Sequence, residues 1–289
     1  MALIAGVRLT HPDRVLWPEQ GITKRALATY LVTVADRLLP ETAGRPLTLL
    51  RCPQGPERKC FVQRHPGEGA PPELRTVEIA EDDGKATYVT ADDPPALVAL
   101  AQIGVLELHP WPARAEDPEH PDRLILDLDP GEGVGFPAVV EAALRLRDLL
   151  ADLGLESFPR TTGGRGLHVV VPLLPEHGWD AHLAAARALA ERLAATSPER
   201  YTTAMPKVER RGRIFVDYLR NGRGASAIAS CSPRARTGAP VATPLAWEEL
   251  TSGLNPSAFT LLSLPERLAA RPDPWAGTLA LRQVLPQGL

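Results

Sequence analysis

Residues 123–131 are Arg-Leu-Ile-Leu-Asp-Leu-Asp-Pro-Gly, an aliphatic run that closes on two aspartates. In a strand, side chains two residues apart point to the same face. Asp127 and Asp129 are therefore expected to project together from the end of a buried strand, while Leu126 and Leu128 face the core. Two adjacent carboxylates repel each other unless a cation lies between them, and proteins hold magnesium or manganese for phosphoryl chemistry in this way. The alternative interpretation is a strand that ends in a solvated Asp-Pro-Gly turn.

The sequence on both sides of this segment predicts a mixed α/β (α+β) fold. Thr23 and Asp93 are expected to cap helices, the first running to about residue 39 and the second ending at Gly104. Further helices are predicted at 136–153, at 181–195 after a cap at Asp180, and in the tail at 244–250 and 256–268. Strands are predicted at 46–52, 60–63, 86–90, 105–109, 123–129, 157–159, 166–173, 213–219 and 225–231.

The overall charge gives no sign of a nucleic-acid-binding protein, but its distribution does. The 289 residues contain 32 Lys and Arg against 35 Asp and Glu, a net charge of -3, and the length suits one large domain or two lobes. Between Arg200 and Arg236, however, nine basic residues stand against two acidic ones, which gives this stretch a charge of +7. The stretch is a candidate phosphate-binding surface, with a solvated arginine-rich surface as the alternative.

The cysteines predict neither a zinc site nor a disulfide framework. There are three, Cys52, Cys60 and Cys231, an odd number without CxxC spacing. Cys52 and Cys231 lie among apolar or small residues and are expected to be packed thiols, which suits a reducing cytoplasm. No segment has the length of a membrane span, and no signal-peptide pattern is expected at the N-terminus.

A glycine-rich turn is predicted at residues 161–168, Thr-Thr-Gly-Gly-Arg-Gly-Leu-His, between two strands. Glycines at such a junction let the backbone approach a ligand and direct N–H groups toward an anion. Thr162 adds a hydroxyl donor, Arg165 a positive charge and His168 a further donor. The segment is not a Walker loop, because the lysine and the following helix are missing. A glycine-rich hairpin with a core histidine is the alternative.

Asp217 is the third carboxylate of interest, because it lies in the apolar run 214–218, Ile-Phe-Val-Asp-Tyr. A carboxylate inside such a run costs several kcal/mol unless it is paired or bound to metal. Either it shares cations with Asp127 and Asp129, or it forms a salt bridge with one of the arginines. Three carboxylates on neighbouring strands can hold two metal ions that position an attacking 3′-hydroxyl and a leaving pyrophosphate.

These motifs resemble those of a known family. Residues 127–133 (Asp-Leu-Asp-Pro-Gly-Glu-Gly), the element at 162–168 and Val216-Asp217 are similar to three motifs of the archaeo-eukaryotic primase superfamily, above all in the polymerase domain of bacterial ligase D, which serves non-homologous end joining. Segments 9–24 and 106–109 are similar as well, so that the likeness covers roughly residues 8–250. It implies a primase-polymerase fold with an RRM-like catalytic sheet. One domain, 1–289, would have a smaller N-terminal α/β lobe at about 1–104 and a catalytic lobe at about 105–289.

The resemblance also implies roles for individual residues. Asp127, Asp129 and Asp217 would be catalytic and bind two divalent ions, Mn²⁺ or Mg²⁺. Contacts to the incoming nucleotide would come from His109, Thr162, Gly163, Gly164, Arg165, Gly166, His168 and Arg234. Arg14 and Lys24 would bind a DNA 5′-phosphate, and Phe61 would stack on the template base.

The chain departs from the family pattern at four of these positions. Thr162 replaces the usual Ser, and arginines stand at 165 and 14 where Lys is common or typical. These changes keep the donor or the charge, with a different geometry at Arg14. Val62 replaces a second aromatic beside Phe61, which weakens the expected stacking platform.

The resemblance predicts a template-directed nucleotidyltransferase, a DNA-directed DNA/RNA polymerase that uses NTP or dNTP, with ribonucleotides preferred. It would extend a DNA 3′ end at gaps or breaks that carry a 5′-phosphate, in the cytoplasm at the nucleoid. A separate ATP-dependent ligase and a Ku-type end-binding protein are the expected partners. The alternatives are a primase-polymerase that starts chains de novo and a non-catalytic DNA-end-binding module. Arg14 and Lys24 disfavour the first, and three carboxylates facing a polyanion disfavour the second.

Overall fold

The computed structural model describes residues 1–82 and 84–286, which form two compact units. The first unit comprises Met1–Pro118, Ile228–Ala242 and Ser257–Arg271. The second comprises Glu119–Ala227, Thr243–Pro256 and the residues from Pro272 onward. The chain first passes between the units at residue 118 and not at the expected 104, because strand β9 (Val105–Pro110) pairs with β5 (Leu47–Arg51) inside the first unit.

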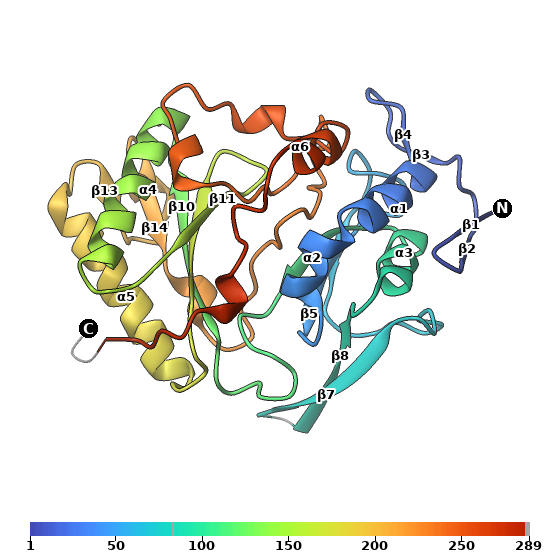
Figure 1. Ribbon diagram of the computed structural model, residues 1–289, viewed down its shortest axis with the longest axis horizontal. Coiled ribbons are helices and arrows are strands. Elements are labelled where there is room, and N and C mark those ends of the chain that lie inside the picture. The colour runs from blue at the N-terminus through green and yellow to red at the C-terminus, as the bar shows by residue number, and fades with distance from the viewer. Residues whose placement is uncertain (83, 287–289) are drawn as a thin grey trace. The chain divides into compact units, whose positions relative to one another are not determined.

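The second unit is built on a five-stranded sheet in the order β11-β12-β10-β14-β13 (Figure 1). Its strands are β10 (Arg123–Pro130), β11 (Phe158–Thr161), β12 (Leu167–Pro172), β13 (Tyr201–Thr202) and β14 (Ile214–Asp217). All neighbours are antiparallel except β13 and β14, which are parallel. Along the chain, four of these strands and two helices follow in the order β10-α4-β11-β12-α5-β14. This is the βαββαβ arrangement of ferredoxin-like sheets, so the prediction of an RRM-like sheet is confirmed.

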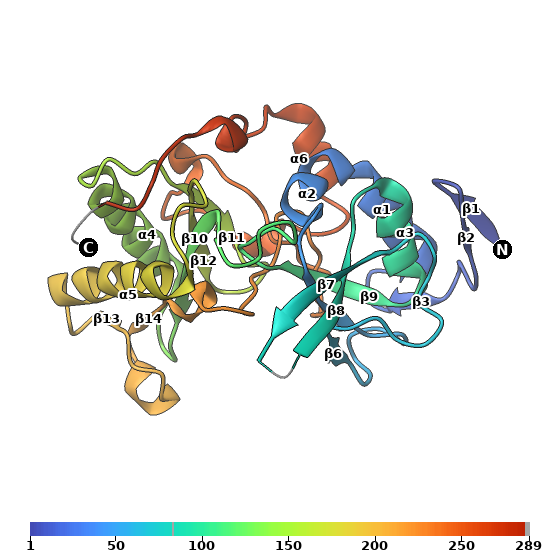
Figure 2. The ribbon, with the colours of Figure 1, turned by 90° about the horizontal axis from the view of Figure 1, so that it is seen from below.

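Helices α4 (Phe136–Ala151) and α5 (Trp179–Thr196) pack against this sheet and against each other, side by side in Figure 2. Their buried residues recur at helical spacing, for example Leu189, Ala190 and Leu193 in α5. In β10 the alternation holds as predicted: Leu126 and Leu128 are fully buried, and the aspartates lie on the other face. Gly178 caps α5, so the predicted cap at Asp180 is wrong; Asp180 lies in the first turn, where its charge favours the helix dipole.

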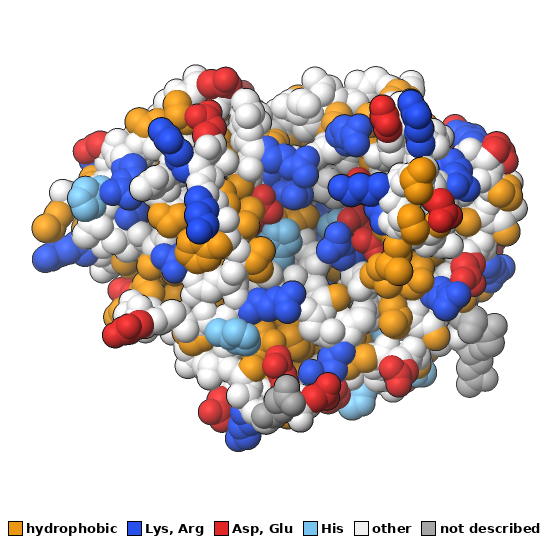
Figure 3. Space-filling model, turned by 180° about the vertical axis from the view of Figure 1, so that it is seen from behind, with side chains coloured by type: hydrophobic (Ala, Val, Ile, Leu, Met, Phe, Trp, Pro, Cys, Tyr) orange, Lys and Arg blue, Asp and Glu red, His pale blue; other side chains and the backbone are white. Residues whose placement is uncertain are grey.

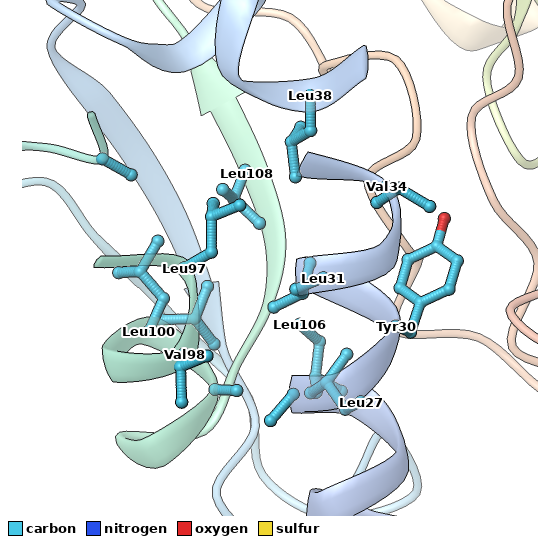
Figure 4. Packing of buried hydrophobic residues seen from close by; sticks show 14 of the residues in the cluster. Leu27, Tyr30, Leu31, Val34, Leu38, Leu97, Val98, Leu100, Leu106 and Leu108 are labelled. Atoms are coloured by element: carbon cyan, nitrogen blue, oxygen red, sulfur yellow. The ribbon is translucent and has the colours of Figure 1, made fainter. Parts of the chain in front are cut away.

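The first unit has four small sheets and four α-helices in its described residues. Three of the sheets are two-stranded: β1 (Ala2–Ile4) with β2 (Val7–Leu9), β3 (Val15–Trp17) with β4 (Ile22–Thr23), and β7 (Arg75–Glu81) with β8 (Gly84–Thr90). The fourth is three-stranded, in the order β6 (Phe61–Gln63), β5, β9. The helices are α1 (Lys24–Thr33), α2 (Ala35–Thr42), α3 (Pro94–Gln102) and α6 (Leu264–Ala270). Figure 4 shows leucines of α1 pointing toward Leu106 and Leu108 of β9, beside leucines of α3, in one buried cluster.

The predicted caps of this unit are confirmed, but its first helix is interrupted. The side chains of Thr23 and Asp93 accept hydrogen bonds from the N–H groups of Ala26 and Ala96. The expected helix from 23 to about 39 breaks at Val34 into α1 and α2, and Pro40 lies inside α2 and does not end it.

Three other expectations about secondary structure differ from the structure. Residues 225–231 contain no strand, because their backbone groups bond to separate partners: the N–H of Ala229 to Leu108, and the N–H of Cys231 to Ala242. Strands β1 to β4 and β7 were not predicted, since most are too short to show a period. The predicted tail helices reduce to 3₁₀ turns at Trp247–Glu249 and Pro256–Ala258 and to α6. No helix among residues 1–82 and 84–286 is long and apolar enough to cross a membrane.

Cys52 and Cys60 form a disulfide (S–S 2.00 Å), so two predictions are wrong: that the cysteines form no disulfide, and that Cys52 is a packed thiol. Strands β5 and β6 pair antiparallel, with Arg51 opposite Phe61. This register places Cys52, which follows Arg51, opposite Cys60, which precedes Phe61. Sequence spacing alone could not reveal this register. Cys231 is a buried free cysteine, as predicted.

Candidate active site

The three candidate catalytic carboxylates lie on one face of the second unit's sheet. Asp127, on the central strand β10, is directly opposite His168 of β12 on one side and Asp217 of β14 on the other. Residues directly opposite each other in a sheet point to the same face. Asp129 follows on that face, opposite Phe215. The cross-strand register thus brings together residues that are about 90 positions apart in the sequence.

Two arginines contact these carboxylates. The Nε atom of Arg220 lies 3.4 Å from Asp217 and 3.7 Å from Asp127, and Arg210 lies 3.8 Å from Asp129. The guanidinium of Arg210 is also stacked over the ring of Phe215, 3.6 Å from its centroid. The salt bridge considered as the alternative for Asp217 is therefore present in the structure.

The carboxylates are nevertheless not fully compensated. Burial raises the pKa of Asp129, the charge of Asp127 raises it further, and Arg210 opposes both. Burial also raises the pKa of Asp217, against the opposing charge of Arg220. A raised pKa means that an additional cation would stabilise the ionised form. Oxygen donors of this kind suit a hard divalent ion, although no three metal-ligating side chains of the described residues are already grouped around one metal position.

The glycine-rich turn joins β11 to β12 and lies against the end of β10. The N–H and hydroxyl of Thr162 both donate to the carbonyl of Gly166, each at 3.2 Å. Gly163 has a φ of +66°, a conformation that glycine adopts without strain. Arg165 donates to the carbonyl of Pro130 at 3.2 Å and so fixes the turn beside the carboxylates. The segment is a glycine-rich hairpin with a buried histidine, and it also has the donors expected of an anion site.

Gly166→Ala is expected to lower the free energy of unfolding by about 1–3 kcal/mol, the usual cost of overpacking. A methyl group at this position would lie 2.7 Å from the carbonyl oxygen of Leu128, so the hairpin would have to shift away from β10. Urea denaturation measures the change. Gly253→Ala is the control, because its nearest heavy atom would be 4.0 Å away. Equal stability of the two variants would contradict the close approach.

In the first unit, Glu107 connects two of the candidate nucleotide-binding residues. Its carboxylate accepts hydrogen bonds from His109 at 2.8 Å and from the N–H of Ala235 at 2.8 Å, and it is ion-paired with Arg234 at 3.1 Å. Burial alone would raise the pKa of Glu107, but the hydrogen bond from His109 and the charge of Arg234 lower that pKa to about 2. Glu107 therefore stays ionised and holds the imidazole and the guanidinium in place.

Lys24 is a buried cation in the same unit. Its ammonium donates to the carbonyl of Thr10 at 3.0 Å and to the side-chain oxygen of Gln102 at 2.9 Å. Burial, and then the charge of Arg14, lower the pKa of Lys24 to about 8. A bound anion would relieve both effects, which agrees with a phosphate-binding role.

The expected template-stacking residue is available at the surface. Phe61 is 42% exposed, and the guanidinium of Arg51 lies 5.2 Å from its ring centroid. Val62 beside it is exposed as well and offers no aromatic face.

The basic stretch 200–236 carries less free charge than its sequence predicts. At least six of its nine basic residues form ion pairs, most of them with acidic residues distant in sequence: Arg200, Arg210, Arg211, Arg220, Arg223 and Arg234. On the face of the molecule shown in Figure 3, Lys and Arg side chains lie among Asp and Glu side chains. The sequence predicted the stretch as a whole to be a phosphate-binding surface, but it did not identify Arg210 and Arg220 as neighbours of the carboxylates. The only signal was the position of Arg220, three residues after Asp217.

Comparison with known proteins gives consistent matches over nearly the whole chain. The family profile described as "LigD, primase-polymerase domain" matches residues 23–275. The chain is 40% identical over 284 residues to the multifunctional non-homologous end joining protein LigD of Pseudomonas aeruginosa, which covers 98% of the chain and 34% of that protein. It is 38% identical over 252 residues to the Mycobacterium tuberculosis LigD, covering 84% and 33%. The chain thus spans about a third of the length of these relatives.

A solved structure matches the fold as well. The polymerase domain of M. tuberculosis Ligase D in complex with DNA is similar with a TM-score of 0.89 and 34% sequence identity. The match covers 95% of this chain and 98% of the solved one.

Proposed function

Because this chain belongs to the LigD primase-polymerase domain family, we propose that it is a template-directed nucleotidyltransferase that acts in DNA repair by non-homologous end joining. It extends a DNA 3′ end, with ribonucleotides preferred over deoxyribonucleotides, at gaps or breaks that carry a 5′-phosphate. The observation that carries the proposal is the cross-strand alignment of Asp127 and Asp217 beside the glycine-rich turn. The names of the relatives, and the DNA bound to the similar solved domain, support it.

Asp127, Asp129 and Asp217 would hold the divalent ions, Mn²⁺ or Mg²⁺. The raised pKa values of Asp129 and Asp217, together with the all-oxygen donor set, fit such ions. Once bound, two ions supply charge neutralisation at the attacking 3′-hydroxyl and at the leaving pyrophosphate. Arg210 and Arg220 balance the same carboxylates through ion pairs when no ion is bound.

The chain's own donors bind and orient the triphosphate in this proposal. The backbone of Gly163, Gly164 and Gly166 approaches the phosphates, and Arg165 supplies a positive charge. Thr162 and His168 add neutral donors. His109 and Arg234 are proposed as further nucleotide contacts on the family resemblance alone. Phosphoryl transfer needs little beyond positioning and charge stabilisation, so no protein general base is invoked.

The 5′-phosphate of the downstream strand would be bound by Arg14 and Lys24, and the template base would stack on Phe61. Burial, and then the charge of Arg14, lower the pKa of Lys24, and a dianion placed beside both groups would offset these effects. Arg14 is already oriented by donation to the carbonyl of Pro53 at 3.2 Å.

Primer extension on a gapped duplex, with and without a 5′-phosphate, tests the proposal. The reactions compare manganese with magnesium and rNTP with dNTP. The wild-type protein is expected to extend the primer, with stimulation by the phosphate. Lys24→Ala is expected to lose about tenfold or more of that stimulation, because a hydrogen bond to a charged group contributes about 1.5–3 kcal/mol. Lys85→Ala is the control, since Lys85 is 70% exposed and pairs only with a surface glutamate in the contacts described. Equal extension of both substrates by the wild type would argue against the phosphate pocket.

A non-catalytic DNA-end-binding module is the second candidate function, because the arginine–carboxylate pairs already neutralise part of the site without metal. Binding of DNA ends without measurable extension would favour it. Synthesis of primers from nucleotides alone on a single-stranded template would instead favour a de novo primase-polymerase. A separate ATP-dependent ligase and a Ku-type end-binding protein are the proposed partners, and the nucleoid in the cytoplasm is the proposed location.

A further inference from the structure

Four polar side chains form one continuous row across the second unit's sheet. Arg160 of β11 is directly opposite His168 of β12, His168 is opposite Asp127 of β10, and Asp127 is opposite Asp217 of β14. The two residues at the β11 end of the row are buried, with Arg160 1% and His168 3% exposed. Arg160 has no part in the nucleotide or metal contacts proposed above.

The contact between Arg160 and His168 fixes which imidazole nitrogen carries the proton. The Nε atom of Arg160 donates to Nδ1 of His168 at 3.2 Å. A guanidinium has donors only, so Nδ1 must offer its lone pair. The proton of the neutral imidazole is then on Nε2, which lies 3.5 Å from the carboxylate of Asp127. A carboxylate accepts, so both neighbours select the same tautomer.

Arg160 is itself held from the other side. The ring of Trp275 packs against its guanidinium, 5.6 Å from Cζ to the ring centroid. The indole N–H of Trp275 donates to the carbonyl of Pro159 at 3.2 Å, which fixes the ring beside β11. The backbone of Arg160 is also bridged to Pro244. The guanidinium is therefore placed by its hydrogen bond to His168 and by the ring of Trp275.

We propose that Arg160 is a positioning residue that locks His168 in the Nε2–H tautomer. His168 then acts only as a donor, toward Asp127 in the free protein and toward a phosphate oxygen when nucleotide is bound. It cannot ligate a metal through Nε2, because that would require a proton on Nδ1, facing the Arg160 donor. The part of the proposal that concerns nucleotide rests on the proposed function, whereas the tautomer does not.

Long-range ¹H–¹⁵N correlation spectra of the ¹⁵N-histidine-labelled full chain, without metal or nucleotide, test the tautomer directly. The chain has seven histidines, and loss of one signal set in His168→Gln identifies His168. The wild type is expected to show a protonated Nε2 and an unprotonated Nδ1. Arg160→Met is expected to shift the population toward Nδ1–H, and Arg160→Lys, which keeps a donor, to retain Nε2–H. A wild-type His168 with its proton on Nδ1 overturns the proposal, whether or not the Arg160 variants fold.

Nucleotide binding provides the second measurement. Calorimetric titration with ATP and Mg²⁺ is expected to show an affinity about 10–100-fold lower for Arg160→Met, as is typical when a supporting partner of a site residue is lost, and near wild type for Arg160→Lys. In steady-state extension, KM for nucleotide should rise more than kcat falls. Unchanged affinity in a folded Arg160→Met protein overturns the positioning role. If the protein extends no primer at all, the proposed function fails, while the tautomer result still decides this inference.

Discussion

Asp127→Asn is expected to reduce the rate of primer extension by more than ~100-fold, beyond the range for loss of a supporting partner. Asp127 is the central carboxylate of the site: it lies between His168 and Asp217 in the sheet and beside Arg220. The substitution keeps the size of the side chain but removes the charge that a divalent ion requires. Rates are measured on the gapped duplex at saturating Mn²⁺, and DNA binding is followed separately by fluorescence anisotropy.

Asp148→Asn is the matched control for this prediction. Asp148 is 66% exposed on α4 and pairs with the neighbouring Arg147, so its loss should leave extension unchanged. Both variants are expected to bind DNA ends like the wild type, since neither removes a positive charge. Extension by Asp127→Asn within tenfold of the control would refute the catalytic assignment. Loss of end binding together with activity would instead point to a folding defect.

Glu107→Gln is expected to lower the free energy of unfolding at pH 7 by about 3 kcal/mol, within the range for breaking a buried ion pair. Glu107 is almost fully buried, and Arg234 beside it is only 16% exposed, so the amide would remove the negative charge of a poorly solvated ion pair. The lowering of the Glu107 pKa from 4.5 to about 2 corresponds to a contribution of similar size. Urea denaturation followed by tryptophan fluorescence measures the difference.

The same residue gives the stability a pH dependence whose sign can be stated. Because the pKa of Glu107 is lower in the folded protein, its contribution is present above about pH 4.5 and is lost as the pH falls toward about 2. Stability of the wild type should therefore decline across this window more steeply than that of Glu107→Gln. Glu78→Gln serves as the control, since Glu78 is 64% exposed. Parallel pH profiles of wild type and Glu107→Gln would show that the pair with Arg234 is not formed in solution.

Local sequence patterns predicted a large part of the fold. The strand at 123–130, with its leucines buried and its aspartates opposite, follows from the period of two in a half-buried strand. The caps at Thr23 and Asp93 follow from side chains that can accept the first free N–H groups of a helix. The break at Val34 was missed because Leu27, Tyr30, Leu31, Val34 and Leu38 keep one apolar face across it. Periodicity reports burial, and it does not report where the helical hydrogen bonds are interrupted.

The sequence by itself determined the chemistry that is available: two carboxylates two residues apart, a third in an apolar run, and a turn rich in glycine and donors. These are properties of neighbouring residues, set by the strand period and by the conformational freedom of glycine. Only the tertiary structure decided which residues distant in sequence lie beside these carboxylates and this turn. The pairing of β11, β12, β10 and β14 places Arg160, His168, Asp127 and Asp217 in one row, and the pairing of β5 with β6 brings two cysteines together. A shift of one residue in any of these pairings would turn the side chains to the opposite face, so the site depends on a register that the sequence of no single strand contains.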